Sequence, residues 1–143
     1  MSINLIPSAH ISSSGLSAEK ARMQIAANNM ANAHSTAGPD GQVYQKRVAV
    51  FQAVFNDQMD QKGEAGTLAG VDMVEVATGR NASQKKFMPY HPAAGEDGMV
   101  EMPDISPIEE MLDMITATRA YEANLSVMKQ GKDMAEKTIN MTK

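Results

Sequence analysis

The residues of this chain that could do chemistry are three histidines, an acidic pair and a run of serines, and their spacing does not fit catalysis. His10, His34 and His91 lie far apart, and none has the partner three or four residues away that a helical metal site needs. Glu96-Asp97 lacks the ligand spacing of a calcium loop and is interpreted as a turn. Ser12-Ser13-Ser14-Gly15 fits a helix start better than a nucleophile, and no Gly-rich phosphate loop or GxSxG motif is present. Cys is absent, which excludes thiolate chemistry and disulfides. We expect no enzymatic activity, no cofactor, no metal and no small-molecule substrate.

The polar side chains that need a structural explanation are amides near the end of a helical segment. Asn28, Asn29 and Asn32 are poor helix formers. They can mark the point where the helix fades, because Asn tolerates left-handed backbone. Alternatively, their amides bind groups of a neighbouring helix and fix its register, as a buried Asn does in coiled coils.

A second polar group lies in the C-terminal segment. Arg119 and Glu122 are three residues apart, so they can pair on one helix or bridge to another subunit. Tyr121 has a ring to bury and a hydroxyl that needs a partner, and Asn124 follows it on the same helix. A solvated helix face is the alternative interpretation of this group.

The element that must position the amides is an N-terminal helix from about residue 8 to 33. We expect it to start at or after Gly15, capped by Ser14 or Ser17. The apolar residues of this segment form two stripes, which are Leu16, Met23, Ala27 and Met30 on one face and Ile11, Ala18, Ala21 and Ile25 on the other. A helix packed on one neighbour needs one stripe. The pattern fits burial on both sides in a monomer, or, as we favour, a place between neighbours in an assembly.

The C-terminal helix has the clearest start signal. Ser106 is a good N-cap, Pro107 suits the first helical position, and Glu109 completes a capping box. Glu110 and Asp113 also lie where the positive end of the helix dipole favours carboxylates. A 3,4 alternation follows through Met111, Met114, Thr118, Tyr121, Leu125, Met128, Lys132, Ala135 and Ile139, which predicts a coiled-coil seam. A second apolar patch comprises Ile108, Leu112 and Ile115.

The segment between the helices predicts a small, irregular β-rich unit. Residues 43–55 and 71–76 are rich in β-branched and aromatic residues, which favours strands. Residues 56–70 are polar and contain three glycines, so we expect a mobile loop. Residues 78–86 show no strand pattern, and Asp97-Gly98 is a turn signal before residues 99–102.

Composition points to a thin core. Of 143 residues, 43% are hydrophobic but only 4% are aromatic, and 13 Met residues supply much of the large apolar volume. Met adapts to irregular and changing surfaces. The net charge is −4 with no basic patch, which argues against a nucleic-acid partner. We find neither a cleavable signal nor an apolar run long enough for a membrane span, and therefore expect a cytoplasmic protein or one exported without signal cleavage.

The two polar groups resemble the signatures of a known family. Ser14-Gly15-Leu16-Ser17-Ala18 with Ala27-Asn28-Asn29-Met30-Ala31-Asn32, and Arg119-Ala120-Tyr121-Glu122-Ala123-Asn124, are similar to the two hallmarks of bacterial flagellar rod and hook proteins. Short length, Pro39-Asp40-Gly41 before Tyr44, and Pro89-Tyr90-His91-Pro92 resemble the proximal rod type. Met88 stands where many relatives have Asp, and the insert between Thr36 and Tyr44 is longer than in the distal rod and hook proteins.

This resemblance implies a structural subunit of the basal-body rod that polymerises axially and forms the proximal part of the drive shaft. It implies a mainly α fold with a small β insert, in which two long terminal helices pair as an antiparallel coiled coil. The domains would be an N-terminal helical arm over 1–35, a β-rich middle domain over 36–103 and a coiled-coil helix over 104–143.

The resemblance also implies partners and a location. The partners would be copies of the chain, other flagellar rod proteins, the protein joining the rod to the MS ring, and the flagellar type III export apparatus. The location would be the periplasmic rod, reached without signal-peptide cleavage or membrane insertion. The expected assembly interface comprises Leu16, Met23, Ile25, Asn28, Asn29, Met30, Asn32, Met114, Arg119, Tyr121, Glu122, Asn124, Leu125 and Met128. Another axial component and a cytoplasmic helical binding module remain as alternatives.

Overall fold

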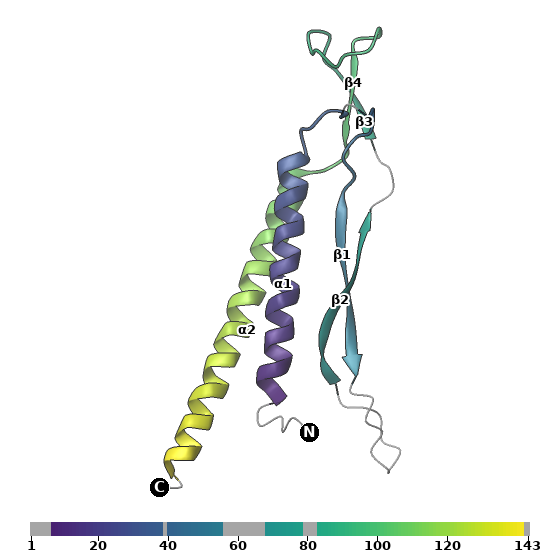
Figure 1. Ribbon diagram of the computed structural model, residues 1–143. Coiled ribbons are helices and arrows are strands. Elements are labelled where there is room, and N and C mark those ends of the chain that lie inside the picture. The colour runs from purple at the N-terminus through teal and green to yellow at the C-terminus, as the bar shows by residue number, and fades with distance from the viewer. Residues whose placement is uncertain (1–6, 39, 56–67, 79–82, 142–143) are drawn as a thin grey trace. The chain divides into compact units, whose positions relative to one another are not determined.

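The described part of the chain contains two long helices and four strands (Figure 1). The computed structural model describes residues 7–38, 40–55, 68–78 and 83–141. The elements in chain order are α1 (Pro7–Asn32), β1 (Arg47–Phe55), β2 (Leu68–Thr78), β3 (Ser83–Phe87), β4 (Met99–Pro103) and α2 (Pro107–Met141). The helices span 26 and 35 residues, so the prediction of a mainly α fold with a small β insert is confirmed.

The strands form two separate sheets of two strands each. β1 pairs with β2, and the two run in opposite directions (Figure 1). β3 and β4 are antiparallel, with Ser83 opposite Pro103 and Phe87 opposite Met99. The chain divides into two compact units by its contacts, which we describe separately. Unit 1 comprises residues 1–21, 50–75 and 116–143, and unit 2 comprises residues 22–49 and 76–115.

Helix α1 begins at Pro7, well before the predicted start at Gly15, so that prediction was wrong. The serines that suggested a cap bond inside the helix instead. Ser14 Oγ donates to the Ile11 carbonyl at 2.8 Å, and Ser17 Oγ donates to the Ser13 carbonyl at 3.2 Å. Hydroxyls satisfied in this way do not interrupt a helix. Pro7 suits the first helical position because it has no N–H to satisfy.

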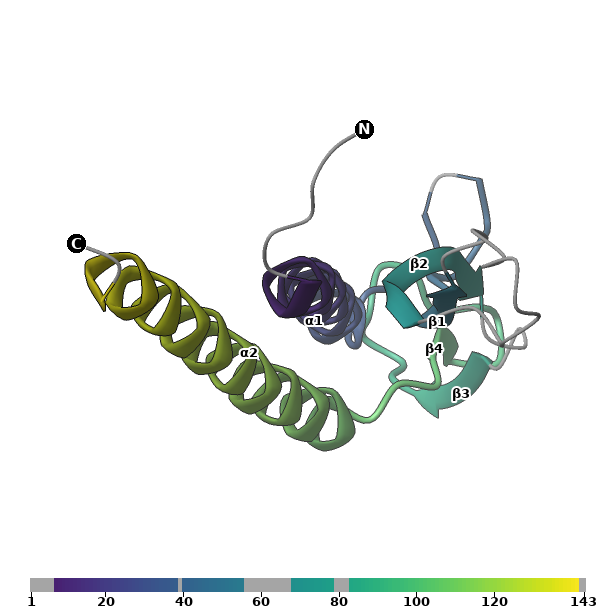
Figure 2. The same cartoon turned by 90° about the horizontal axis from the view of Figure 1, so that it is seen from below.

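Helix α2 begins at Pro107, as predicted from the capping residues. Its first turn closes with the Glu110 amide donating to the Ser106 carbonyl at 3.2 Å. The helix then runs without interruption to Met141 (Figure 2). Among the described residues, no helix is both long and apolar enough to cross a bilayer.

The middle segment differs from the prediction in three places. β1 starts at Arg47, so residues 43–46 lie outside the strand. β2 includes Leu68–Gly70, which the sequence had assigned to a loop, while the rest of that predicted loop, residues 56–67, lies outside the described residues. β3 was missed because all five of its residues are exposed. An edge strand with two solvated faces has no apolar alternation to detect. The predicted turn before β4 is confirmed, with Gly98 at φ +68°.

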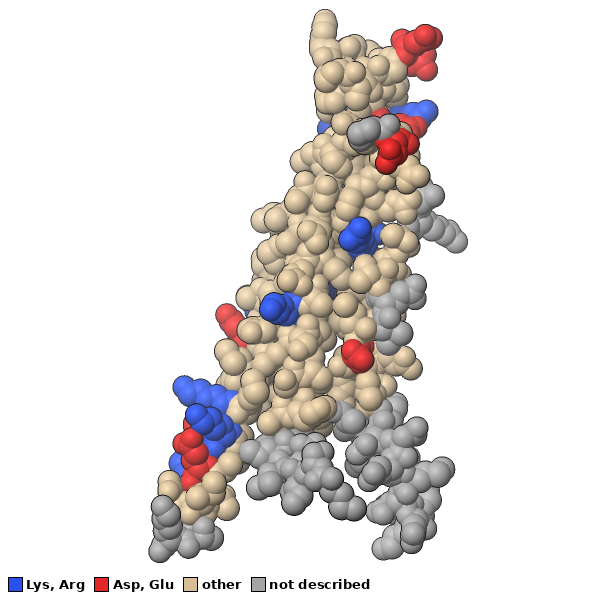
Figure 3. Space-filling view, in the orientation of Figure 1, with Lys and Arg blue, Asp and Glu red and all other residues tan. Residues whose placement is uncertain are grey.

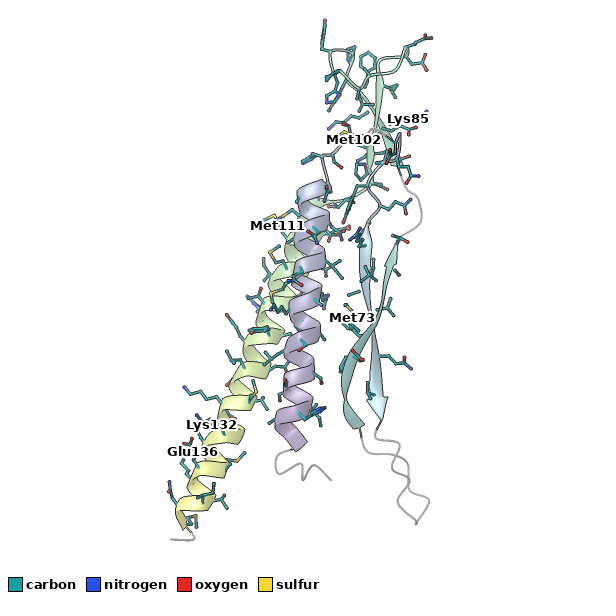
Figure 4. All side chains as sticks on the ribbon, viewed as in Figure 1. Met73, Lys85, Met102, Met111, Lys132 and Glu136 are labelled. Atoms are coloured by element: carbon teal, nitrogen blue, oxygen red, sulfur yellow. The ribbon has the colours of Figure 1, made fainter. Side chains whose placement is uncertain are left out.

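The two units bury different kinds of residue. Unit 2 has a small apolar core that includes Val100, Met102 and Ile105, and Met102 is labelled in Figure 4. In unit 1, the buried side chains of the described residues are no larger than Ser12, Ala18 and Ala117. Small side chains allow close backbone approach but remove little apolar area from water. The described residues of unit 1 therefore bury little apolar surface among themselves.

Candidate functional site

A buried polar cluster in unit 2 is centred on Asn29. Asn29 is only 1% exposed, and its Nδ2 donates to the Glu110 carboxylate at 2.9 Å and to the Arg47 carbonyl at 2.8 Å. Its Oδ1 accepts from the Tyr44 hydroxyl and from the Arg47 amide, both at 3.0 Å. All four hydrogen-bonding positions of this amide are filled. With Lys46, described next, these residues form the Asn29 cluster.

A charged pair completes the Asn29 cluster. Glu110 is 1% exposed, and the Lys46 ammonium lies 2.8 Å from its Oε1. Lys46 also lies 3.8 Å from the exposed carboxylate of Glu109. The hydrogen bond with Glu110 raises the pKa of Lys46 against the opposing effect of burial. Burial raises the pKa of the Tyr44 hydroxyl, with Arg47 opposing and Glu110 reinforcing. Lys46 and Tyr44 are therefore held in their protonated forms, which are the donors that the cluster needs.

The Asn29 cluster joins three stretches of chain that are distant in sequence. Asn29 comes from α1, Glu110 from α2, and Tyr44, Lys46 and Arg47 from the approach to β1 and its first residue. A second ion pair between the helices, from Arg22 Nη2 to Asp113 Oδ1 at 2.9 Å, lies in the same unit. The two contacts run in opposite senses along the helices, so α1 and α2 are antiparallel neighbours here.

Sequence reasoning found only part of this cluster. The interpretation that Asn29 binds a neighbouring helix is confirmed, and the partner is Glu110 of the same chain. Glu110 had been assigned to the helix dipole, which missed its burial. Tyr44 and Lys46 were not candidates, because a strand-like pattern gives no sign that its polar residues turn toward a helix. The only available signal was an amide placed inside a helix.

The two signature segments also meet in unit 1. A Cβ added at Gly15 would lie 2.9 Å from Nδ2 of Asn124, so α1 and α2 approach closely because residue 15 has no side chain. Ser14 Oγ accepts a hydrogen bond from the Val71 amide of β2 at 3.1 Å. The neighbouring Gly70 has φ +154°, and a Cβ there would lie 2.6 Å from Ser14 Oγ. The serine–glycine segment of α1 is thus a packing site for both α2 and β2.

A groove beside α1 brings together residue types that can form a hydrolase triad. The groove has a volume of about 520 Å³, and its walls include His10, Ser14 and Asp72. The Ser14 hydroxyl donates its proton to the Ile11 carbonyl and accepts from a backbone amide, so it is committed to structure. A nucleophilic serine must instead give its proton to a base. Within the described part of the chain, no group of three potential metal ligands comes together.

The remaining expected interface residues differ in exposure. Leu16, Met23, Ile25, Met30, Asn32, Met114, Tyr121, Asn124 and Met128 are half-buried, whereas Asn28, Arg119, Glu122 and Leu125 are exposed. Asn32 bonds within its own helix, with Nδ2 donating to the Asn28 carbonyl at 2.8 Å. Among the contacts between described residues, Asn29 is the amide of the N-terminal signature that bridges to other elements.

The most buried positions of α2 do not coincide with the predicted seam. They are Glu110, Ala117 and Gly131, each one residue before a predicted seam position. Large apolar side chains stay outside, and the most exposed of them on α2 are Ile108, Leu112, Met134, Ile139 and Met141. Scattered apolar residues are normal on a surface, but a long helix that exposes this many is typical of an assembly interface.

Comparison with known proteins identifies the family. Residues 10–39 match the family model described as "Flagella basal body rod protein", and residues 96–141 match "Flagellar basal body rod FlgEFG protein C-terminal". The flagellar basal-body rod protein FlgC of Aquifex aeolicus is 38% identical over 135 residues, covering 93% of each chain. FlgC of Salmonella typhimurium is 33% identical over 131 residues, covering 92% of each. FlgC of Borreliella burgdorferi is 32% identical over 143 residues, covering 92% of this chain and 93% of the relative.

These matches extend over both signature segments and the strands between them. The family models include the Ser14–Gly15 packing site, Asn29 and the whole stretch from Arg119 to Asn124. The relatives align over nearly their full length, so the likeness is not confined to a shared helix. The chain belongs to the FlgC family of flagellar basal-body rod proteins.

Proposed function

We propose that this protein is a structural subunit of the flagellar rod, which polymerises axially with other rod proteins and forms the proximal part of the drive shaft. The observation that carries the proposal is the full-length match to FlgC proteins at 32–38% identity. The relatives are rod proteins rather than enzymes, and the Ser14 hydroxyl accordingly donates its hydrogen bond to a backbone carbonyl instead of to a catalytic base. The basal body is accordingly the site of action.

The helices are the proposed assembly elements. In the assembled rod, α1 and α2 would pair as an antiparallel coiled coil and form the axial core, with residues 1–35 and 104–143 in this role and 36–103 outside it. The antiparallel contacts of unit 2 support this pairing. The large apolar residues left outside those contacts support further packing against neighbouring subunits. The predicted interface residues, with Tyr121 at their centre, would make these contacts.

The proposed partners are copies of the chain, other rod proteins and the protein that joins the rod to the MS ring. The flagellar type III export apparatus would deliver the subunit to the periplasmic rod without signal cleavage. Assembly with other rod proteins in the basal body is supported by the family, whose members are named as basal-body rod proteins.

Replacement of the resident protein tests the proposal. The chain is expressed in a strain that lacks its own FlgC, and basal bodies are purified and analysed by mass spectrometry. We expect the chain in the rod fraction, with an N-terminus at or next to Met1, and restored motility. A soluble monomer that accumulates in the cytoplasm without entering basal bodies would support a binding module instead.

A further inference from the structure

Four large apolar side chains near the start of α2 lie on the surface. Ile108 is 79% exposed, Met111 52%, Leu112 62% and Ile115 50%. We call these four residues the outer stripe, and Met111 marks its position in Figure 4. At 100° per residue they occupy one arc of the helix, opposite the buried Glu110. In this part of α2, the buried carboxylate and the exposed apolar side chains therefore lie on opposite sides of the helix.

The spacing of the outer stripe fits a helical partner. Its members stand at positions i, i+3, i+4 and i+7, the pattern by which one helix packs along another. Such a partner needs apolar surface along one side, which a large apolar side chain and the aliphatic stems of lysines can supply, and charges that match the border of this stripe.

The border of the outer stripe is acidic. Residues 104–115 contain four acidic residues and no basic one. Two of the four are paired within the chain, Glu110 with Lys46 and Asp113 with Arg22. Asp104, which precedes α2, and Glu109 are exposed, and the Glu109 carboxylate lies 3.8 Å from the Lys46 ammonium that Glu110 also contacts. Pairing two outer stripes with each other would bring two acidic borders together. The preferred partner is therefore a helix with a basic border.

A basic complement lies further along the same helix. Residues 125–141 contain three Lys and two acidic residues, for a net charge of +1. Leu125, Lys129 and Lys132 stand at i, i+4 and i+7, and all three are exposed. We call them the basic stripe. Charged side chains gather toward this end of α2, where Lys132 pairs loosely with Glu136 at 3.6 Å (Figures 3 and 4).

We propose that the outer stripe of one copy docks on the basic stripe of a second copy. The two surfaces are different patches of one chain, so the contact is heterologous and leaves an unused stripe at each end of a pair. Contacts of this type build open polymers, whereas self-complementary contacts close into dimers. This inference rests on the proposed function and specifies which faces of α2 meet in it.

Single cysteines test the contact, because the chain has none of its own. Full-length Ile115→Cys and Ser126→Cys variants are treated with a short bis-maleimide, each alone and as a mixture. Ser126 is exposed and lies beside Leu125. We expect cross-linked dimers from the mixture and none from either variant alone. Cross-linking of Ile115→Cys with itself would show self-pairing of the outer stripe and overturn the proposal, as would a mixture that gives no dimer.

Charge reversal tests the reason for the contact. Adding Glu109→Lys to the Ile115→Cys chain should lower the yield of mixed dimers about tenfold, because two basic borders then meet. Adding Lys132→Glu to the Ser126→Cys chain should restore the yield. Leu112→Asp should abolish it, whereas Tyr90→Asp, at a fully exposed residue outside α2, should not. If the yield of mixed dimers does not change when these charges are reversed, the proposal is overturned. Entry of the chain into basal bodies, measured separately, would then leave the proposed function standing.

Discussion

Replacement of Asn29 by Asp is the most demanding test of the Asn29 cluster, because it keeps the side-chain volume while it removes two donors and adds a negative charge. In the native protein, Nδ2 of Asn29 donates to the Glu110 carboxylate at 2.9 Å and to the Arg47 carbonyl at 2.8 Å. In Asn29→Asp, an oxygen takes the place of that nitrogen. Two carboxylate oxygens then face each other in a site where Asn29 and Glu110 are each 1% exposed.

The size of the effect follows from these distances. Two unit charges 2.9 Å apart repel by about 6 kcal/mol at an effective dielectric constant of about 20. The lost bond to the Arg47 carbonyl adds about 1 kcal/mol. Asn29→Ala leaves the same groups without a partner but adds no charge, so it should cost about 3 kcal/mol. We therefore expect the isosteric Asp variant to be less stable than the truncated Ala variant at neutral pH.

Urea unfolding of the full chain, followed by far-ultraviolet circular dichroism, measures both variants. Lowering the pH should reduce the difference in unfolding free energy between the Asp and Ala variants, because a proton shared by the two carboxyl groups removes the repulsion. Asn28→Asp is the matched control, since Asn28 is exposed on the same helix, and it should cost less than about 1 kcal/mol. If Asn29→Asp is as stable as the native chain at neutral pH, the Asn29–Glu110 bond does not hold this unit together.

Three further predictions concern other parts of the chain. Lys46→Met should cost about 3 kcal/mol at neutral pH, because it strands the buried Glu110 carboxylate. Because the pKa of Lys46 is raised in the folded state, the contribution of its charge to stability is complete below about pH 10 and is lost as the pH rises through the folded-state pKa. The free energies of unfolding of the native chain and of Lys46→Met, measured in urea, should therefore converge in strong alkali. Gly70→Ala should lower the urea midpoint more than Gly41→Ala, because both need positive φ but only Gly70 also meets Ser14; equal shifts would contradict the close approach. Tyr121→Ala should abolish rods in purified basal bodies while leaving the protein made and exported, since Tyr121 is half-buried in the single chain and its full burial in the assembly would make its loss cost about 3–5 kcal/mol per subunit; normal motility would show that Tyr121 is not an assembly contact.

The sequence was a good guide to the elements whose signals are local. The start of α2 was predicted correctly because Ser106, Pro107 and Glu109 act on the first turn itself. The turn before β4 was predicted because Gly98 needs positive φ. The start of α1 was wrong because Ser14 and Ser17 can cap a helix or bond inside it, and their local sequence suits both.

The candidate site was predictable in type but not in composition. An amide inside a helix indicated a partner across a helix contact, and Asn29 has one. Lys46 and Glu110 could not be assigned to it, because which distant segments meet depends on the fold of the whole unit. The family signatures were visible in the sequence from the start, since they are contiguous runs of residues.

What the sequence by itself determined was the amount of apolar surface on the two helices and the residues that carry it. Only the tertiary structure decided which part of that surface the chain uses for itself. Within the chain, α2 buries Glu110, Ala117 and Gly131 and leaves Leu112 and its neighbours outside. The physical reason is that small residues and hydrogen-bonded polar pairs can be buried where two helices approach closely. The apolar periodicity of the sequence shows every apolar face of a helix and does not tell which neighbour covers it. The pattern therefore adds together the contacts of one subunit and those that its neighbours would make.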